Sequence, residues 1–164
     1  MGTGDSNRVT FTVVGSGTAV PEPDRVCSGY FLETGDLRIL LDCGSGVVHH
    51  LAAFALEWPR ITHLALSHFH NDHIGDLPML FFALEYGMLP PRREPLTIIG
   101  PAGLADRMRR LADALGDHVS DPGFDVELIE LAHGEVALAG GTRLTVHRTP
   151  HTDDSIAYRI ENDA

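Results

Sequence analysis

The stretch HFHNDH at residues 68–73 decides how this sequence is interpreted. It places three imidazoles and one carboxylate within six positions, directly after a short apolar strand. Alternate side chains of an extended chain lie on one face, so His68 and His70 point the same way if the strand continues. Asp72 and His73 follow where the chain must turn, and four ligand-type side chains can therefore converge at the end of this strand.

The side-chain types in this stretch are those of a metal site. Imidazole and carboxylate groups together bind zinc and the neighbouring transition metals. The spacing differs from the helical H-E-x-x-H pattern of metalloproteases, in which two histidines lie one helical turn apart. A surface loop that is rich in histidine by chance is the alternative, but the position between an apolar strand and an apolar helix favours a metal site.

Length and composition indicate one globular domain with an acidic surface. The chain has 164 residues, of which 43% are hydrophobic and 21% are charged, and this excludes a disordered chain. All basic side chains are arginines, and the formal net charge of −11 excludes a generic basic coat protein for nucleic acids. It does not exclude an enzyme that concentrates positive charge, or a metal, in one pocket.

Cysteine usage and hydropathy favour a cytoplasmic protein with no membrane association. Cys27 and Cys43 are too few for a disulfide scaffold or for a four-thiolate zinc site. No apolar run approaches the roughly 18 residues of a membrane span. The polar segment Met1–Arg8 contains no apolar signal-peptide region.

Strand-like and helix-like segments alternate along the chain, which predicts an α/β or α+β class in stacked layers. The expected strands are Val9–Val14, Tyr30–Glu33, Leu37–Leu41, Ile61–Leu66, Leu96–Ile99, Asp125–Leu131, Arg143–Val146 and Ser155–Ile160. The expected helices are Val47–Leu56, Pro78–Tyr86 and Leu104–Leu115.

The H-x-H-x-D-H pattern resembles the metal motif of the metallo-β-lactamase superfamily, in its ribonuclease Z-like phosphodiesterase branch. The resemblance spans Thr10–Ile160 and includes further landmarks of that branch: Leu40–Gly46, Val13–Thr18 with Pro21, Gly75–Pro78 and Gly100–Leu104. Asn71 and Asp76 differ from the usual ribonuclease Z pattern and resemble the phosphodiesterase-like and arylsulfatase-like relatives.

The resemblance implies a four-layer αββα sandwich, of which this chain supplies mainly the N-terminal αβ half. It also implies a ligand set. His68, His70 and His151 would hold a first zinc ion, since His151 lies at the family's next ligand position, ahead of the last expected strand. Asp72 and His73 would belong to a second ion, and Asp72 would also orient the attacking water.

The implied activity is that of a metal-dependent hydrolase. A zinc pair lowers the pKa of a bound water toward about 7 and supplies hydroxide at neutral pH. The expected substrate is a phosphodiester, either an RNA 3′ end or a small molecule, and manganese or iron could replace zinc. Two alternatives stay open: hydrolysis of another ester (a sulfate ester, lactone or thioester) and a non-catalytic metal-binding half-domain that acts through assembly.

The ligand set implied by the resemblance is not complete in residues 1–164. The family's bridging aspartate and last histidine have no counterpart in a matching context, and Asp153 and Asp154 lie too close to His151 to replace them. We therefore expect a single domain that is incomplete at its C-terminus. It would act with a missing C-terminal half or as a homo-oligomer, because the strand Ser155–Ile160 would leave an exposed edge.

Other polar residues have simpler interpretations. Asp42 is expected to cap the turn into the following helix and to support the metal loop from behind, and a cap alone is the alternative. Two groups of basic residues are expected to be solvated surface charge rather than RNA contacts. These groups are Arg92-Arg93 and Arg107-Arg109-Arg110.

Overall fold

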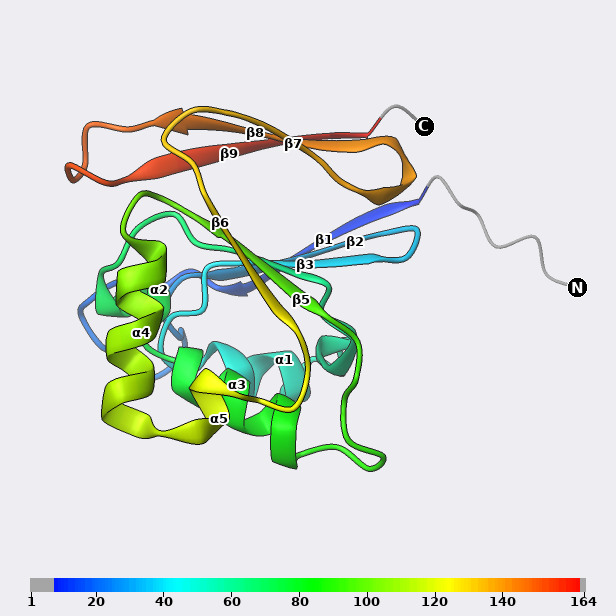
Figure 1. Ribbon diagram of the computed structural model, residues 1–164. Helices are drawn as coiled ribbons and strands as arrows, with labels where there is room; N and C mark the ends of the chain where they lie inside the picture. The colour runs from blue at the N-terminus through cyan, green and yellow to red at the C-terminus, as the bar shows by residue number, and fades with distance from the viewer. Residues whose placement is uncertain (1–7, 163–164) are drawn as a thin grey trace, which may run out of the picture.

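A computed structural model describes residues 8–162 of the chain as three stacked layers. Helices cover one face of a six-stranded sheet, and a three-stranded sheet covers the other face (Figure 1). Residues 1–7 lie outside the described residues. The prediction that the N-terminus contains no signal peptide falls on this segment. Among the described residues, no helix is long and apolar enough to cross a membrane.

The first sheet has the strand order β1-β2-β3-β4-β5-β6, antiparallel from β1 to β3 and parallel from β3 to β6. Its strands are β1 (Val9–Gly15), β2 (Gly29–Thr34), β3 (Leu37–Leu41), β4 (His63–Ala65), β5 (Leu96–Gly100) and β6 (Val126–Glu130). Parallel neighbours need crossover connections, and helices make these connections here. The carboxyl ends of β3, β4 and β5 consequently lie at one edge of the sheet.

The helical layer packs on one face of this sheet. It consists of α1 (Val47–Ala53), α2 (Asn71–Ile74), α3 (Leu77–Tyr86), α4 (Leu104–Leu115) and α5 (Asp117–Ser120), with short 3₁₀ turns at Trp58–Arg60 and Ala139–Gly141. Helix α3 is apolar around most of its surface and buries Leu77, Leu80, Phe81 and Leu84. Helix α4 has one apolar stripe and buries Leu104 and Met108.

The second sheet is formed by β7 (Gly134–Ala137), β8 (Thr142–Arg148) and β9 (Ile156–Asn162), in the order β7-β8-β9. Buried side chains of both sheets form a second core between them, which includes Leu32, Ile39, Leu144, Val146 and Ile156. The hydroxyl group of Tyr158 on β9 lies 2.7 Å from the carbonyl oxygen of Leu66 and 3.0 Å from that of Ile99. The second sheet is thereby fixed to the ends of β4 and β5.

The predicted elements all occur, and the α/β class with stacked layers is confirmed. The helix expected over Val47–Leu56 ends early, at Ala53, because Ala55 adopts a positive φ of 53° that leaves the helical region. The strand expected over Ile61–Leu66 is shorter and spans His63–Ala65. The short elements α2, α5 and β7 were not predicted.

One prediction about surface charge is wrong. Arg92 is not solvated: it is 3% exposed, in the connection between α3 and β5. Its guanidinium donates hydrogen bonds to the carbonyl oxygens of Pro59, Ile61, Glu94 and Pro95. The planar guanidinium offers five donors, so one arginine satisfies four buried or partly buried carbonyl groups, two in this loop and two near the 3₁₀ turn at Trp58–Arg60.

Candidate metal centre

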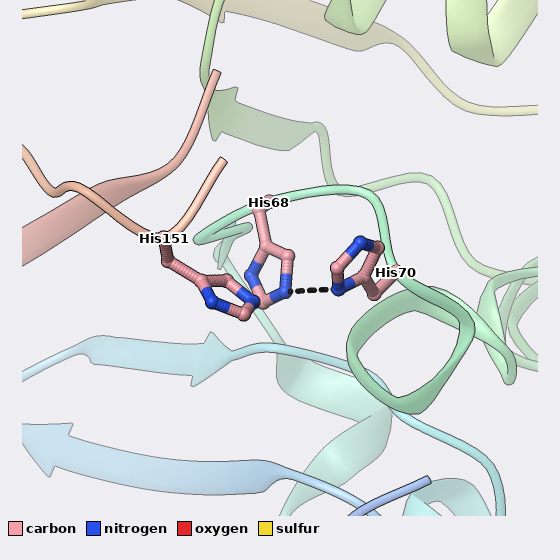
Figure 2. A group of neighbouring side chains, drawn as sticks. All are labelled: His68, His70 and His151. Carbon is pink, nitrogen blue, oxygen red and sulfur yellow. Dashed lines mark hydrogen bonds between the residues drawn. The ribbon is translucent and has the colours of Figure 1, made fainter. Parts of the chain in front are cut away.

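The candidate centre lies at the edge of the first sheet where β4 ends. The chain leaves β4, passes through His68 and His70, and enters the short helix α2, which carries Asp72 and His73. His151 comes from the loop between β8 and β9 and lies beside the other two histidines (Figure 2). The structure thus brings together all five residues that the sequence singled out as ligands.

Three imidazoles converge on one point. The ligand nitrogens of His68, His70 and His151 all lie within 4.8 Å of one another. Nε2 of His68 is 3.2 Å from Nδ1 of His70, the contact drawn in Figure 2. Two nitrogens at the zinc–nitrogen distance, in tetrahedral geometry, would lie about 3.3 Å apart. The observed spacing therefore fits two ligands of one tetrahedral ion.

Asp72 and His73 lie next to this group. The ring centroids of His68 and His73 are 4.0 Å apart, and Nε2 of His73 is 3.6 Å from Oδ2 of Asp72. The two side chains are partly exposed, at 22% for His73 and 20% for Asp72. One imidazole and one carboxylate thus stand beside the three-histidine group.

Asp42 and Ser67 orient two of the histidines from behind. Oδ2 of Asp42 lies 2.6 Å from Nδ1 of His73 and accepts a hydrogen bond from the Ser67 hydroxyl at 2.9 Å. Its Oδ1 accepts the backbone N–H of Ser67 at 2.8 Å. Because a carboxylate only accepts, Nδ1 of His73 carries a proton, and in the neutral imidazole the lone pair lies on Nε2.

The same reasoning applies to His68 through the serine. The Ser67 hydroxyl donates its proton to Asp42, so it accepts from Nδ1 of His68, which lies 3.0 Å away. Nε2 of His68 therefore also presents a lone pair to the centre. Hydrogen bonds to the second ring nitrogen commonly fix the tautomer of metal-binding histidines in this way.

The two histidines differ in proton affinity. Burial, together with the neighbouring imidazoles of His73 and His70, lowers the pKa of His68 below its ordinary value. Burial also disfavours the charged form of His73, but the hydrogen bond and charge of Asp42 and the charge of Asp72 outweigh it and raise the pKa of His73. His68 is therefore the more readily available as a neutral ligand.

The turn that carries Asp42 is packed directly against the metal-binding segment. The backbone N–H of Cys43 donates to the carbonyl oxygen of His73 at 2.7 Å. A Cβ atom at Gly44 would lie 2.0 Å from the carbonyl oxygen of Asp72, so only glycine permits this approach.

Of the two roles expected for Asp42, the helix cap is wrong. Helix α1 begins after Gly46 and has no side-chain cap at that position. The carboxylate of Asp76 instead accepts the N–H of Val48 in the first turn of α1, at 2.9 Å. Asp42 has a positive φ of 58° and is 6% exposed, and its carboxylate faces Ser67 and His73.

A cavity of about 790 Å³ opens beside the centre. His70, Asn71 and Asp72 line one side of it, and the loop from Thr18 to Cys27 lines the other. Phe69 contributes an aromatic face. The cavity is large enough to admit a small organic ligand next to the histidines.

The sequence interpretation did not assign a role to Ser67, Ser155 or Tyr158. Ser67 directly precedes the motif, and this position was the one signal that could have drawn attention to it. The role of Tyr158 depends on contacts with residues distant in the sequence, and no local pattern reveals them. Ser155 contacts the nearby Thr149 and Thr152, but a single serine at the end of a loop carries no signal of its own.

Comparison with known proteins identifies the family. Residues 9–163 match the protein family described as "Anti-Pycsar protein Apyc1". The chain belongs to this family. Its relatives also place it in the ribonuclease Z-like branch of the metallo-β-lactamase superfamily, which confirms the resemblance seen in the H-x-H-x-D-H pattern.

Curated relatives of this Apyc1 family member carry the name Ribonuclease Z. The protein of Halorubrum lacusprofundi is 38% identical over 159 residues, which are 96% of this chain and 48% of the relative. The protein of Ignicoccus hospitalis is 29% identical over 154 residues, which are 94% of this chain and 49% of the relative. The chain thus spans about half the length of these relatives.

Solved structures with the same fold support the assignment. The metallo-β-lactamase fold protein YhfI from Bacillus subtilis matches with a TM-score of 0.74 and 26% identity, over 95% of this chain and 58% of that protein. The short form of human tRNase Z matches with a TM-score of 0.75 and 25% identity, over 94% of this chain and 65% of that protein. These matches confirm the predicted fold and its partial coverage.

Proposed function

We propose that this chain is the metal-binding part of a hydrolase that cleaves phosphodiesters. The observation that carries the proposal is the convergence of three imidazoles whose ligand nitrogens lie within 4.8 Å of one another. The ribonuclease Z name of its relatives supports a phosphodiester as the substrate, either RNA or a smaller molecule.

We assign the ligands as follows. His68, His70 and His151 hold a first zinc ion, and Asp72 and His73 contribute to a second. Asp42 acts behind them and, directly or through Ser67, keeps the lone pairs of His73 and His68 aimed at the centre. Zinc is our choice among the metals because it favours imidazole ligands and small coordination numbers.

Each part of the site then has a task in hydrolysis. When bound, zinc lowers the pKa of a coordinated water toward about 7 and acts as a Lewis acid on a phosphoryl oxygen. The partly exposed Asp72 carboxylate accepts a hydrogen bond from the attacking water and orients it. The cavity beside Asp72 receives the part of the substrate that flanks the scissile bond.

We further propose that residues 1–164 form a single domain that acts together with more polypeptide. The coverage of about half of each curated relative supports this. A C-terminal half of the same protein, or a second copy of this chain, would supply the remaining ligands of the second ion. The cytoplasmic location expected from the sequence belongs to the same proposal.

Metal analysis and a hydrolysis assay test the proposal. We expect the purified chain to retain zinc after dialysis, and the His68→Ala/His70→Ala double variant to lose it. His49→Ala is the matched control, because His49 is an exposed histidine on α1 outside the group. A wild-type chain that retains no zinc, manganese or iron would contradict the metal-site proposal.

Hydrolysis of bis(p-nitrophenyl) phosphate then separates catalysis from binding alone. We expect zinc-dependent release of p-nitrophenol that the double variant lacks. Release of p-nitrophenol from a sulfate ester but not from the phosphodiester would favour the other-ester alternative. A zinc-loaded chain that hydrolyses neither ester, even when it is extended by its downstream half, would favour the non-catalytic half-domain.

A further inference from the structure

One buried hydroxyl group holds the loop that carries His151. The loop runs from Thr149 to Ser155 between β8 and β9, and Ser155 at its end is 2% exposed. The Oγ atom of Ser155 accepts hydrogen bonds from the Thr149 hydroxyl at 2.7 Å and from the Thr152 N–H at 2.9 Å. Its own proton goes to the carbonyl oxygen of Thr149 or of Thr152, each 3.1 Å away.

Apolar packing does not hold this loop. Residues 149–154 read TPHTDD, and the one apolar side chain among them, Pro150, is exposed. His151 is also exposed, so its own burial does not fix its position. The conformation of the loop therefore depends on polar contacts. The Ser155 hydroxyl is the group with the largest number of them. Others come from backbone bonds between Thr149, Thr152 and Ser155 and from the contacts of Arg148 with Asp153 and of Thr152 with Asp154.

The base of the loop is attached to the segment that carries His68. The N–H of Ile156, the residue after Ser155, donates to the carbonyl oxygen of Ser67 at 2.9 Å, and Ser67 directly precedes His68. The N–H of Thr149 donates to the carbonyl oxygen of Ser155 at 2.9 Å and closes the loop at the same point. Ser155 thus links the anchored backbone to the loop that presents His151.

We propose that Ser155 is a positioning residue for His151, and that its hydroxyl group sets the affinity of the first metal site. This rests on the metal site proposed above. Without the hydroxyl, the loop keeps its covalent ends but loses the contacts that determine where His151 points. Loss of a residue that orients a ligand typically weakens metal binding by about 10- to 100-fold.

A double-mutant cycle tests this proposal. The zinc dissociation constant of wild type, Ser155→Ala, His151→Ala and the double variant is measured by competition with a chromophoric chelator. We expect Ser155→Ala to weaken zinc binding by about 10- to 100-fold in the wild-type background and to have no further effect in the His151→Ala background. Equal losses in both backgrounds would show a general structural effect and overturn the positioning role.

A spectroscopic readout and a matched control complete the test. Cobalt(II) bound to Ser155→Ala should show the weaker visible absorption of His151→Ala, which a merely destabilised fold would not produce. Thr142→Val is the control, because Thr142 has a buried hydroxyl at the opposite end of β8. We expect this variant to be less stable but to keep the wild-type zinc affinity.

The remaining outcomes are also decisive. If Ser155→Ala does not fold, Thr149→Val, which removes the donor to the Ser155 hydroxyl, must weaken zinc binding, and wild-type affinity would overturn the proposal. A wild-type chain that does not bind zinc would overturn both this proposal and the metal site. If Ser155→Ala binds zinc as tightly as the wild-type chain does, the positioning role alone is overturned.

Discussion

Asp42 is a buried carboxylate that serves two histidines at once. Its two oxygens accept hydrogen bonds from the Ser67 backbone, the Ser67 hydroxyl and the imidazole of His73. Buried carboxylates are costly unless such donors satisfy them, and here the donors all belong to the metal-binding segment. The residue therefore couples the stability of the turn to the orientation of the ligands.

Replacing this carboxylate by an amide should reverse the tautomer of His73. In Asp42→Asn the amide oxygen has to accept the Ser67 N–H, so the amide nitrogen faces Nδ1 of His73 and can only donate. Nδ1 must then accept, and the proton moves to Nε2, which can no longer bind a metal. We expect ¹⁵N chemical shifts of the imidazole to show the changed tautomer, and zinc affinity to fall. Asp76→Asn, whose side-chain oxygen can still accept the N–H of Val48, should keep the wild-type tautomer and affinity. An unchanged His73 tautomer in Asp42→Asn would contradict this account.

His63, outside the metal group, should make the fold sensitive to acid. Burial lowers its pKa below the ordinary value, with a smaller opposing effect of Glu127. The unfolded chain therefore binds more protons at this residue than the folded chain when the pH falls below about 6.5. The contribution of His63 to the stability of the fold is fully present above that pH, and it is lost as the pH falls toward the pKa of His63 in the folded state.

Urea unfolding of the metal-free protein measures this effect. The free energy of unfolding should fall between pH 7 and pH 5, and it should fall less in His63→Gln, which cannot titrate. His49→Gln, with an exposed imidazole, should behave as wild type does. Equal pH dependence of His63→Gln and wild type would exclude this contribution.

The candidate ligands could be predicted from the sequence because most of them are neighbours. Four of the five lie within residues 68–73, and the family pattern gave the position of His151. The hydrogen bonds that orient them could not be predicted. Asp42 and Ser67 are 25 positions apart, and their contact depends on the register of β3 beside β4.

At the scale of elements, Arg92 holds the long connection between α3 and β5. Its four carbonyl acceptors come from two separate segments of the chain. We expect Arg92→Met to lower the free energy of unfolding by about 2–4 kcal/mol, because it leaves several buried carbonyl groups without donors. Arg93→Met, at an exposed position, should change stability by less than about 0.5 kcal/mol. Urea unfolding measures both, and equal effects of the two would contradict the role of Arg92.

Elements with a strong periodic pattern were predicted well, and short ones were not. Leu104–Leu115 matches α4 because its apolar positions repeat at the helical period over three turns. Helix α2 has four residues, too few for any period to appear. Strand β7, with the sequence GEVA, lacks a β-branched run and exists because β8 pairs with it.

At the scale of the whole molecule, part of the inner face of the first sheet is not covered by the second. Val9, Phe11 and Val13 on β1 are 51%, 56% and 51% exposed. Phe11 pairs with Leu32, so it points to the same side as the core between the sheets. Among the described residues, strand β9 forms one edge of the second sheet.

The exposed apolar side chains of Val9, Phe11 and Val13 on β1 should make the chain self-associate. We expect sedimentation velocity to show reversible, concentration-dependent association, and Phe11→Ser to shift the distribution toward monomer. Val20→Ser is the control, because Val20 is an exposed apolar residue in the loop after β1, outside the sheet. An unchanged distribution in Phe11→Ser would show that other surfaces drive association.

The separation of the ligands along the chain gives the first metal site a consequence beyond chemistry. His70 and His151 are about eighty residues apart, and an ion held by both would cross-link the first sheet to the second. A cross-link that closes a loop of this length reduces the entropy of the unfolded chain by an amount worth about 4 kcal/mol. Zinc would therefore raise the free energy of unfolding, as a disulfide bond does, in a protein whose two cysteines are unpaired.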